Sequence, residues 1–124
     1  MKFAHAMIRV ADIDKSMRFY CDLLGLKVAK TMDLEDCRLY YLTDSFGNTH
    51  IELTHNHETP DGGYKNGSAF GHFAFETEDL DEFTKKLRSM GYDYTEPPFM
   101  LEELGIRISF IEDPDGNAIE VIEA

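Results

Sequence analysis

Two histidines and two glutamates recur at matched places in the two halves of this 124-residue chain. His72 follows His5 by 67 residues, and Glu120 follows Glu52 by 68 residues. Each glutamate lies in an otherwise apolar run, where a buried carboxylate needs a partner. Imidazole nitrogens and carboxylate oxygens together suit a borderline divalent ion such as Zn²⁺, Ni²⁺, Co²⁺ or Fe²⁺. We therefore predict that these four residues are metal ligands.

Taken singly, each of the four is more simply explained as a satisfied core histidine or a charge on a strand face. Their matched placement favours the metal site. Each half supplies only one histidine and one glutamate, so the site must draw on both halves, within one chain or across a dimer. His50 alternates onto the Glu52 face and is a rival ligand, but its counterpart is Ala118. His55 and His57 begin a polar linker, where solvated histidines are expected.

The elements that carry these residues also repeat. Alternating apolar residues in the first half predict strands at 2–10, 26–32, 38–43 and 49–54, with a helix capped by Asp12 or Asp14 and ended by Gly25. The second half predicts strands at 69–76, near 92–95, 106–111 and 117–122, with a helix over about 80–90 between Asp79 and Gly91. The irregular segment 96–105 is expected to form a flap.

This repeat predicts an α+β fold of two tandem βαβββ modules. We expect them to form an open, cup-shaped mixed sheet with the helices on its outer face. The modules cover 1–54 and 68–124, joined by a Gly-rich linker at 55–67, in one compact domain overall. The apolar neighbours of the two glutamates should pack on the helices: Ile51 and Leu53 in one module, Ile119 and Val121 in the other.

The excess of acidic residues argues against some classes of binding partner. The 12 basic and 24 acidic residues give a formal net charge of −12, which argues against nucleic acid and anionic membranes as partners. No apolar run approaches the length of a membrane span, and no signal peptide is evident, so a cytoplasmic protein is expected. Cys21 and Cys37 form no CxxC pair and are expected to be free, partly buried thiols.

The motifs around the four ligand candidates resemble those of glyoxalase I (lactoylglutathione lyase), in the vicinal-oxygen-chelate superfamily. They are His-Ala-Met-Ile-Arg-Val from His5, Ile-Glu-Leu-Thr-His-Asn around Glu52, Phe-Gly-His ending at His72, and Glu-Asp-Pro-Asp-Gly-Asn-Ala-Ile-Glu ending at Glu120. The resemblance covers nearly the whole chain. It implies isomerisation of the hemithioacetal of methylglyoxal and glutathione to S-lactoylglutathione, through an ene-diolate stabilised by the metal. This activity detoxifies methylglyoxal.

The resemblance also assigns roles to residues. Glu120 is implied as the catalytic base, with Glu52 as the second carboxylate of the site. We expect Glu120 to move more freely, because it lies on the last strand while Glu52 is held from both sides. Arg9 and Asn56 match residues that bind glutathione; a further basic residue of the family is replaced by Glu102 and Glu103, and Lys65 or Arg107 are candidates to take its place.

The compact chain resembles the bacterial class, which implies Ni²⁺ or Co²⁺ rather than Zn²⁺, and a homodimer. The alternative enzymes are other metal-dependent members of the superfamily, an epimerase or a dioxygenase. Dioxygenases use two histidines and one glutamate, so Glu52 counts against them, and the epimerase has glutamine at that place. The alternative from another class is a metal-free small-molecule-binding module of the same fold, which would lack the four ligands.

Overall fold

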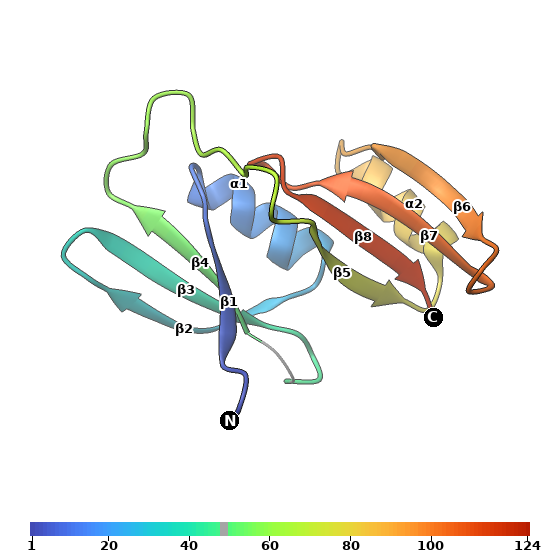
Figure 1. Ribbon diagram of the computed structural model, residues 1–124, viewed down its shortest axis with the longest axis horizontal. Helices are drawn as coiled ribbons and strands as arrows, with labels where there is room; N and C mark the ends of the chain where they lie inside the picture. Colours follow the sequence, from blue (N-terminus) through green and yellow to red (C-terminus); the bar gives the residue numbers. More distant parts are fainter. Residues whose placement is uncertain (48–49) are drawn as a thin grey trace. The chain divides into compact units, whose positions relative to one another are not determined.

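The computed structural model describes residues 1–47 and 50–124 (Figure 1). It divides into two compact units, Met1–Lys65 (unit 1) and Asn66–Ala124 (unit 2). Each unit contains one four-stranded sheet of parallel and antiparallel strands and one helical segment. The predicted α+β class with two tandem βαβββ modules is confirmed. No helix in the described residues is long and apolar enough to cross a membrane.

Unit 1 runs β1, α1, η1, β2, β3, β4. These elements are β1 (His5–Arg9), α1 (Ile13–Met17), the π-helix η1 (Arg18–Leu23), β2 (Lys27–Asp33), β3 (Cys37–Thr43) and β4 (His50–Asn56). The strand order in the sheet is β1-β4-β3-β2. β1 pairs with β4 in parallel, whereas the other neighbours are antiparallel.

The first helix starts and stops where the sequence predicts, but its second half is a π-helix. Asp12 caps the start by accepting a hydrogen bond from the backbone N–H of Lys15. Further along, Leu24 donates to the carbonyl of Phe19, five residues back, which is the wider spacing of a π-turn. Gly25 then ends the segment with φ of +80°, a conformation that glycine adopts readily.

Unit 2 repeats this order as β5, α2, β6, β7, β8. Its elements are β5 (His72–Thr77), α2 (Leu80–Ser89), β6 (Glu96–Leu101), β7 (Ile106–Glu112) and β8 (Ala118–Glu123). The strand order is β5-β8-β7-β6, with β5 parallel to β8. Asp79 caps α2 by accepting from the N–H of Glu82, as its position predicts.

The strand expected near 92–95 and the flap expected at 96–105 are both wrong. The second strand of the module is β6, which begins at Glu96 and contains Pro97 and Pro98. Proline has no N–H to donate, so it is tolerated at the edge of a sheet. β6 is the edge strand, and its register with β7 shifts between Glu96 and Phe99, where the prolines lie.

The central strands β4 and β8 carry the two glutamates. Their alternate residues Ile51, Leu53, Ile119 and Val121 are buried, as predicted. β8 lies between β5 and β7 just as β4 lies between β1 and β3. The reason expected for a greater freedom of Glu120, its place on the last strand, is therefore wrong. Both glutamates lie on strands paired on either side.

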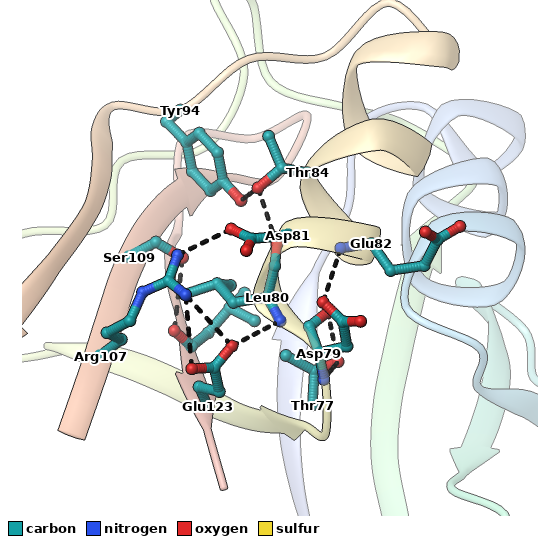
Figure 2. A network of polar contacts seen from close by, with 11 residues as sticks. Thr77, Asp79, Leu80, Asp81, Glu82, Thr84, Tyr94, Arg107, Ser109 and Glu123 are labelled. Carbon is teal, nitrogen blue, oxygen red and sulfur yellow. Dashed lines mark hydrogen bonds and ion pairs between the residues drawn. The ribbon is translucent and has the colours of Figure 1, made fainter.

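A polar network fixes α2 to the sheet of unit 2 (Figure 2). Arg107 of β7 pairs with Asp81 of α2 at 2.9 Å, and with Glu123 of β8 at 3.5 Å. Glu123 in turn accepts a 2.9 Å hydrogen bond from the N–H of Leu80, at the first turn of α2. Arg107 is thus engaged on the helix side of the sheet, opposite the face of Glu120.

Candidate functional site

His5 and Glu52 lie on neighbouring strands of one sheet face. β1 and β4 are parallel and place Met7 opposite Glu52. His5 lies two residues before Met7 on the same strand face, so its side chain projects beside the glutamate. The His5 Nε2 and Glu52 Oε2 atoms are 2.7 Å apart. The imidazole side chain is 38% exposed and the carboxylate side chain 9%. The pair therefore has a carboxylate set into the sheet and a histidine reachable from solvent.

His72 and Glu120 form the equivalent pair in unit 2. β5 and β8 place Ala74 opposite Glu120, which repeats the offset of the first pair. The His72 Nε2 and Glu120 Oε2 atoms are 2.9 Å apart, with side chains 42% and 15% exposed. The sequence repeat thus extends to the relative position of the donor atoms.

An aromatic ring supports each histidine from the third strand. Tyr41 meets the His5 ring edge-on, with centroids 5.5 Å apart and an interplanar angle of 81°. Phe110 meets the His72 ring in the same way, at 5.6 Å and 78°. Such T-shaped contacts restrict the ring planes, which helps to fix the direction of each imidazole nitrogen.

Glu52 has two hydroxyl neighbours in addition to His5. The Thr54 hydroxyl donates to Glu52 Oε1 at 3.3 Å, and both residues are buried. Tyr41 lies directly across the strand pair from Glu52. The pKa of the Tyr41 hydroxyl is raised, mainly by desolvation, and also by the negative charge of Glu52 and a hydrogen bond to that carboxylate.

The chemistry of these donors fits a divalent metal. Two neutral imidazoles and two carboxylates provide four N/O ligands and two negative charges, which balance the charge of the ion. No group of three or more His, Cys, Asp or Glu residues that could hold a metal occurs in residues 1–47 and 50–124. Each unit by itself offers one pair, so a complete site needs both pairs.

The remaining histidines do not join these pairs. His50 lies opposite His5 in the strand register, on the same face, but forms no metal-binding group with it in the described structure. His55 lies opposite Arg38, on the other face of the sheet. His57 follows β4, and its backbone N–H donates to the carbonyl of Asp36.

The two predicted substrate-binding residues lie on the face of Glu52. Arg9 is exposed at the end of β1, opposite Thr54. It forms no ion pair with any residue that the structure describes, so its guanidinium remains available. Asn56 is half-buried at the end of β4, where its amide donates to the Tyr64 hydroxyl at 3.0 Å. This contact fixes the orientation of the Asn56 side chain.

Sequence reasoning missed three residues on this face. Thr54 had a usable signal, because residues two apart on a strand share a face. Tyr41 and Lys30 depend on strand register, which the sequence does not state. Lys30 lies opposite Tyr41 across β2 and β3, with its Nζ 4.6 Å from the centre of the Tyr41 ring. It brings a second cation to the face that carries Arg9.

Curated proteins with similar sequences match the chain over almost its full length. A probable lactoylglutathione lyase of Synechocystis is 38% identical over 99% of this chain and 95% of the relative. A lactoylglutathione lyase of Neisseria meningitidis is 33% identical over 99% of this chain and 91% of the relative. The chain covers 44% of a lactoylglutathione lyase of Arabidopsis thaliana, at 32% identity.

Solved structures agree with these relatives. Glyoxalase I from Zea mays superposes with a TM-score of 0.86 at 29% identity, over 99% of this chain and 44% of the maize chain. The trypanothione-dependent glyoxalase I of Leishmania major gives a TM-score of 0.76 at 33% identity, over 98% and 86%. The family model of the Glyoxalase/Bleomycin resistance protein/Dioxygenase superfamily matches residues 2–121. The chain therefore belongs to this superfamily.

Proposed function

We propose that the protein is a lactoylglutathione lyase, which isomerises the hemithioacetal of methylglyoxal and glutathione to S-lactoylglutathione. The observation that carries this proposal is the duplicated His–Glu pair. His5 and Glu52, and His72 and Glu120, approach within 2.7 and 2.9 Å through the same pair of atoms in each unit. The names of the Synechocystis and Neisseria relatives support the same activity.

In this proposal, His5, Glu52, His72 and Glu120 hold one divalent metal ion. When bound, the ion acts as a Lewis acid that stabilises the negative charge developing on the two adjacent oxygens of the substrate. The pairs come from one chain or from two copies in a homodimer. We favour Ni²⁺ or Co²⁺ over Zn²⁺, because the chain shares the compact length of its bacterial relatives.

Glu120 is proposed as the base. It removes the proton from the carbon that bears sulfur and returns it to the neighbouring carbon. The hydroxyl proton moves between the two substrate oxygens, so one C–H bond breaks, another forms, and no external oxidant or reductant is needed. His72 lies 2.9 Å from the carboxylate and supports its orientation. Glu52 is the second carboxylate of the site.

Arg9 and Asn56 are proposed to hold the glutathione part of the substrate. The exposed guanidinium of Arg9 suits one of its carboxylates, through a charge-assisted hydrogen bond. The Asn56 amide, oriented by Tyr64, offers a neutral hydrogen-bonding group on the same face. Lys30 supplies a further positive charge that offsets the acidity of the chain near an anionic substrate.

The proposal is tested on protein stripped of metal with a chelator and reloaded with Ni²⁺, Co²⁺ or Zn²⁺. Formation of the thioester from methylglyoxal and glutathione is followed by its ultraviolet absorbance. We expect activity with Ni²⁺ or Co²⁺ above that with Zn²⁺, and none in the stripped protein. Metal-loaded protein that forms no thioester would overturn the activity. Highest activity with Zn²⁺ would overturn only the metal preference.

A mixing experiment decides whether one chain or two copies supply the ligands. His5→Ala and His72→Ala each damage one pair and leave the other intact. If a site combines the pairs of two copies, a mixed dimer of the two variants contains one complete site and regains activity. If each site belongs to one chain, the mixture stays as inactive as its components.

A further inference from the structure

The two carboxylates of the proposed site have different neighbours, although their strands, histidines and register match. Glu52 accepts a hydrogen bond from the Thr54 hydroxyl at 3.3 Å and lies opposite Tyr41 in the register of β3 and β4. Within the part of the chain that the structure describes, the polar side-chain partner of Glu120 is His72. One carboxylate is therefore restrained at several points and the other at one.

The residues responsible occupy equivalent places in the two units. Tyr41 lies opposite Glu52 in the register of β3 and β4, and Phe110 lies opposite Glu120 in the register of β7 and β8. The contacts of the two rings with their histidines are nearly identical, at 5.5 and 5.6 Å. The units thus differ here by one phenolic hydroxyl, present in unit 1 and absent in unit 2.

The second difference lies two residues beyond each glutamate. Thr54 follows Glu52 on the same strand face, whereas Ile122 follows Glu120. Ile122 lies opposite Ile108 of β7, so an apolar pair stands where unit 1 has a hydroxyl. Neither side chain can donate a hydrogen bond to the carboxylate.

We propose that Tyr41 and Thr54 are positioning residues that hold Glu52 still as the permanent ligand, while Phe110 and Ile122 leave Glu120 free to turn toward the substrate as the base. This inference rests on the proposed function and deepens it. Hydrogen bonds to a carboxylate are stronger than those between neutral groups. Rotating Glu52 would break the hydrogen bond from Thr54 and carry the carboxylate away from Tyr41, in addition to breaking its contact with His5. Among the described residues, rotating Glu120 breaks its contact with His72.

Burial alone does not explain why Glu52 has hydroxyl neighbours and Glu120 does not, among the described residues. A buried carboxylate needs hydrogen-bond partners wherever it lies. The Glu52 and Glu120 side chains are 9% and 15% exposed, so both are largely removed from water. Among the residues that the structure describes, hydroxyl groups lie beside Glu52 but not beside Glu120. This difference in hydroxyl neighbours therefore supports different roles for Glu52 and Glu120, which the repeat places in otherwise equivalent positions.

The inference is tested by removing the hydroxyls near Glu52 and by adding one near Glu120. Two quantities are measured separately, the affinity for Ni²⁺ and kcat. The affinity for Ni²⁺ alone is measured by equilibrium dialysis without substrate, and kcat is measured at saturating Ni²⁺. Tyr41→Phe and Thr54→Val should weaken Ni²⁺ binding by about 10- to 100-fold, as is typical when a residue supporting a metal ligand is lost. Their kcat at saturating metal should change far less. Thr54→Ser retains a hydroxyl and should restore the affinity.

Phe110→Tyr makes the opposite change. Since the Phe110 and Tyr41 rings lie alike against their histidines, the new hydroxyl should reach Glu120 as that of Tyr41 reaches Glu52. We expect kcat to fall at least about tenfold, because a base restrained by a new hydrogen bond loses part of its contribution. Ni²⁺ affinity should be unchanged or higher. Tyr40→Phe, on the opposite face of β3 from Tyr41, is the matched control and should alter neither quantity.

The outcomes separate this inference from the proposed function. If the parent protein binds Ni²⁺ and forms the thioester, the function holds whatever the variants do. The inference is then overturned if Tyr41→Phe and Phe110→Tyr alter the same quantity, or if neither alters affinity or kcat. A thermal unfolding midpoint close to that of the parent verifies that each variant is folded. If the parent binds no Ni²⁺, the proposed metal site itself fails.

Discussion

Arg107 of β7 and Asp81 of α2 form an ion pair, with Nη2 and Oδ1 2.9 Å apart (Figure 2). Arg107 is the Lys or Arg residue within the strands of unit 2, and this ion pair holds its guanidinium against α2. The candidate substitute for the basic residue missing near Glu102 and Glu103 thus has a structural role. On the His5 face, Arg9 of β1 forms no ion pair with any residue that the structure describes, and Lys30 lies over the Tyr41 ring on β2, at the opposite edge of the same sheet.

The Asp81–Arg107 pair predicts a dependence of stability on pH. The hydrogen bond and the charge of Arg107 hold the pKa of Asp81 below its ordinary value of 3.8. A carboxyl with a lower pKa in the folded state stabilises the fold above its unfolded pKa, and the effect is lost as pH falls through the folded value. Asp81→Asn should therefore lower the unfolding temperature near neutral pH, and the gap to the parent should close in acid.

Thermal unfolding measured from pH 7 to pH 3 checks this prediction. Asp93→Asn is a suitable control, because Asp93 is equally exposed but lies 3.8 Å from its partner Arg88. Its unfolding temperature should follow that of the parent at every pH. A gap between Asp81→Asn and the parent that stays constant down to pH 3 would contradict the electrostatic explanation.

Arg9→Ala should lower kcat/KM for the hemithioacetal. A hydrogen bond to a charged group contributes about 1.5–3 kcal/mol, which corresponds to about ten- to a hundredfold in kcat/KM. Arg38→Ala is the matched control, since Arg38 lies on the other face of the same sheet and pairs with Asp33. A change below twofold in Arg9→Ala would show that the substrate carboxylate is bound elsewhere.

Removing either histidine should weaken metal binding. We expect one divalent ion per complete set of four ligands, and a large loss of affinity in His5→Ala and in His72→Ala, because each leaves three donors. Elemental analysis and equilibrium dialysis measure stoichiometry and affinity. His57→Ala removes a loop histidine and should bind as the parent does. Unchanged affinity in His72→Ala would rule out a site built from both pairs.

The repeat allowed much of the fold to be predicted, and it singled out the residues of the two His–Glu contacts. In each unit, local sequence patterns predict the elements correctly. Asp12 and Asp79 mark the starts of the helices, and alternating apolar residues mark β4 and β8. The failures have physical causes. Edge strand β6 has two prolines and a register shift, so its pattern looked like a loop.

The cross-strand neighbours of Glu52 and Glu120 could not be predicted from the sequence, because they depend on strand register. Tyr41 lies opposite Glu52 only once the register of β3 and β4 is known, and one residue of slip would turn it to the other face. The place of β8 in the middle of its sheet also follows from the parallel pairing with β5, which is distant in sequence. The place of Glu120 on the last strand of the chain had therefore suggested the wrong reason for its freedom, because that strand is paired on both sides.

Glu120→Gln and Glu52→Gln should differ in their effect on kcat. Glutamine retains the shape and a neutral oxygen ligand but cannot accept the substrate proton. A positioned base contributes about 10²–10⁴ in rate, so Glu120→Gln should lose at least about a hundredfold in kcat while much of the metal binding persists. Glu52→Gln should lose less, because its amide oxygen still coordinates and Thr54 and Tyr41 can still donate to that oxygen. The deciding measurement is kcat of both variants at verified metal occupancy. An active Glu120→Gln beside an inactive Glu52→Gln would reverse the assignment, and would mean that the hydroxyls of unit 1 orient the base rather than restrain a ligand.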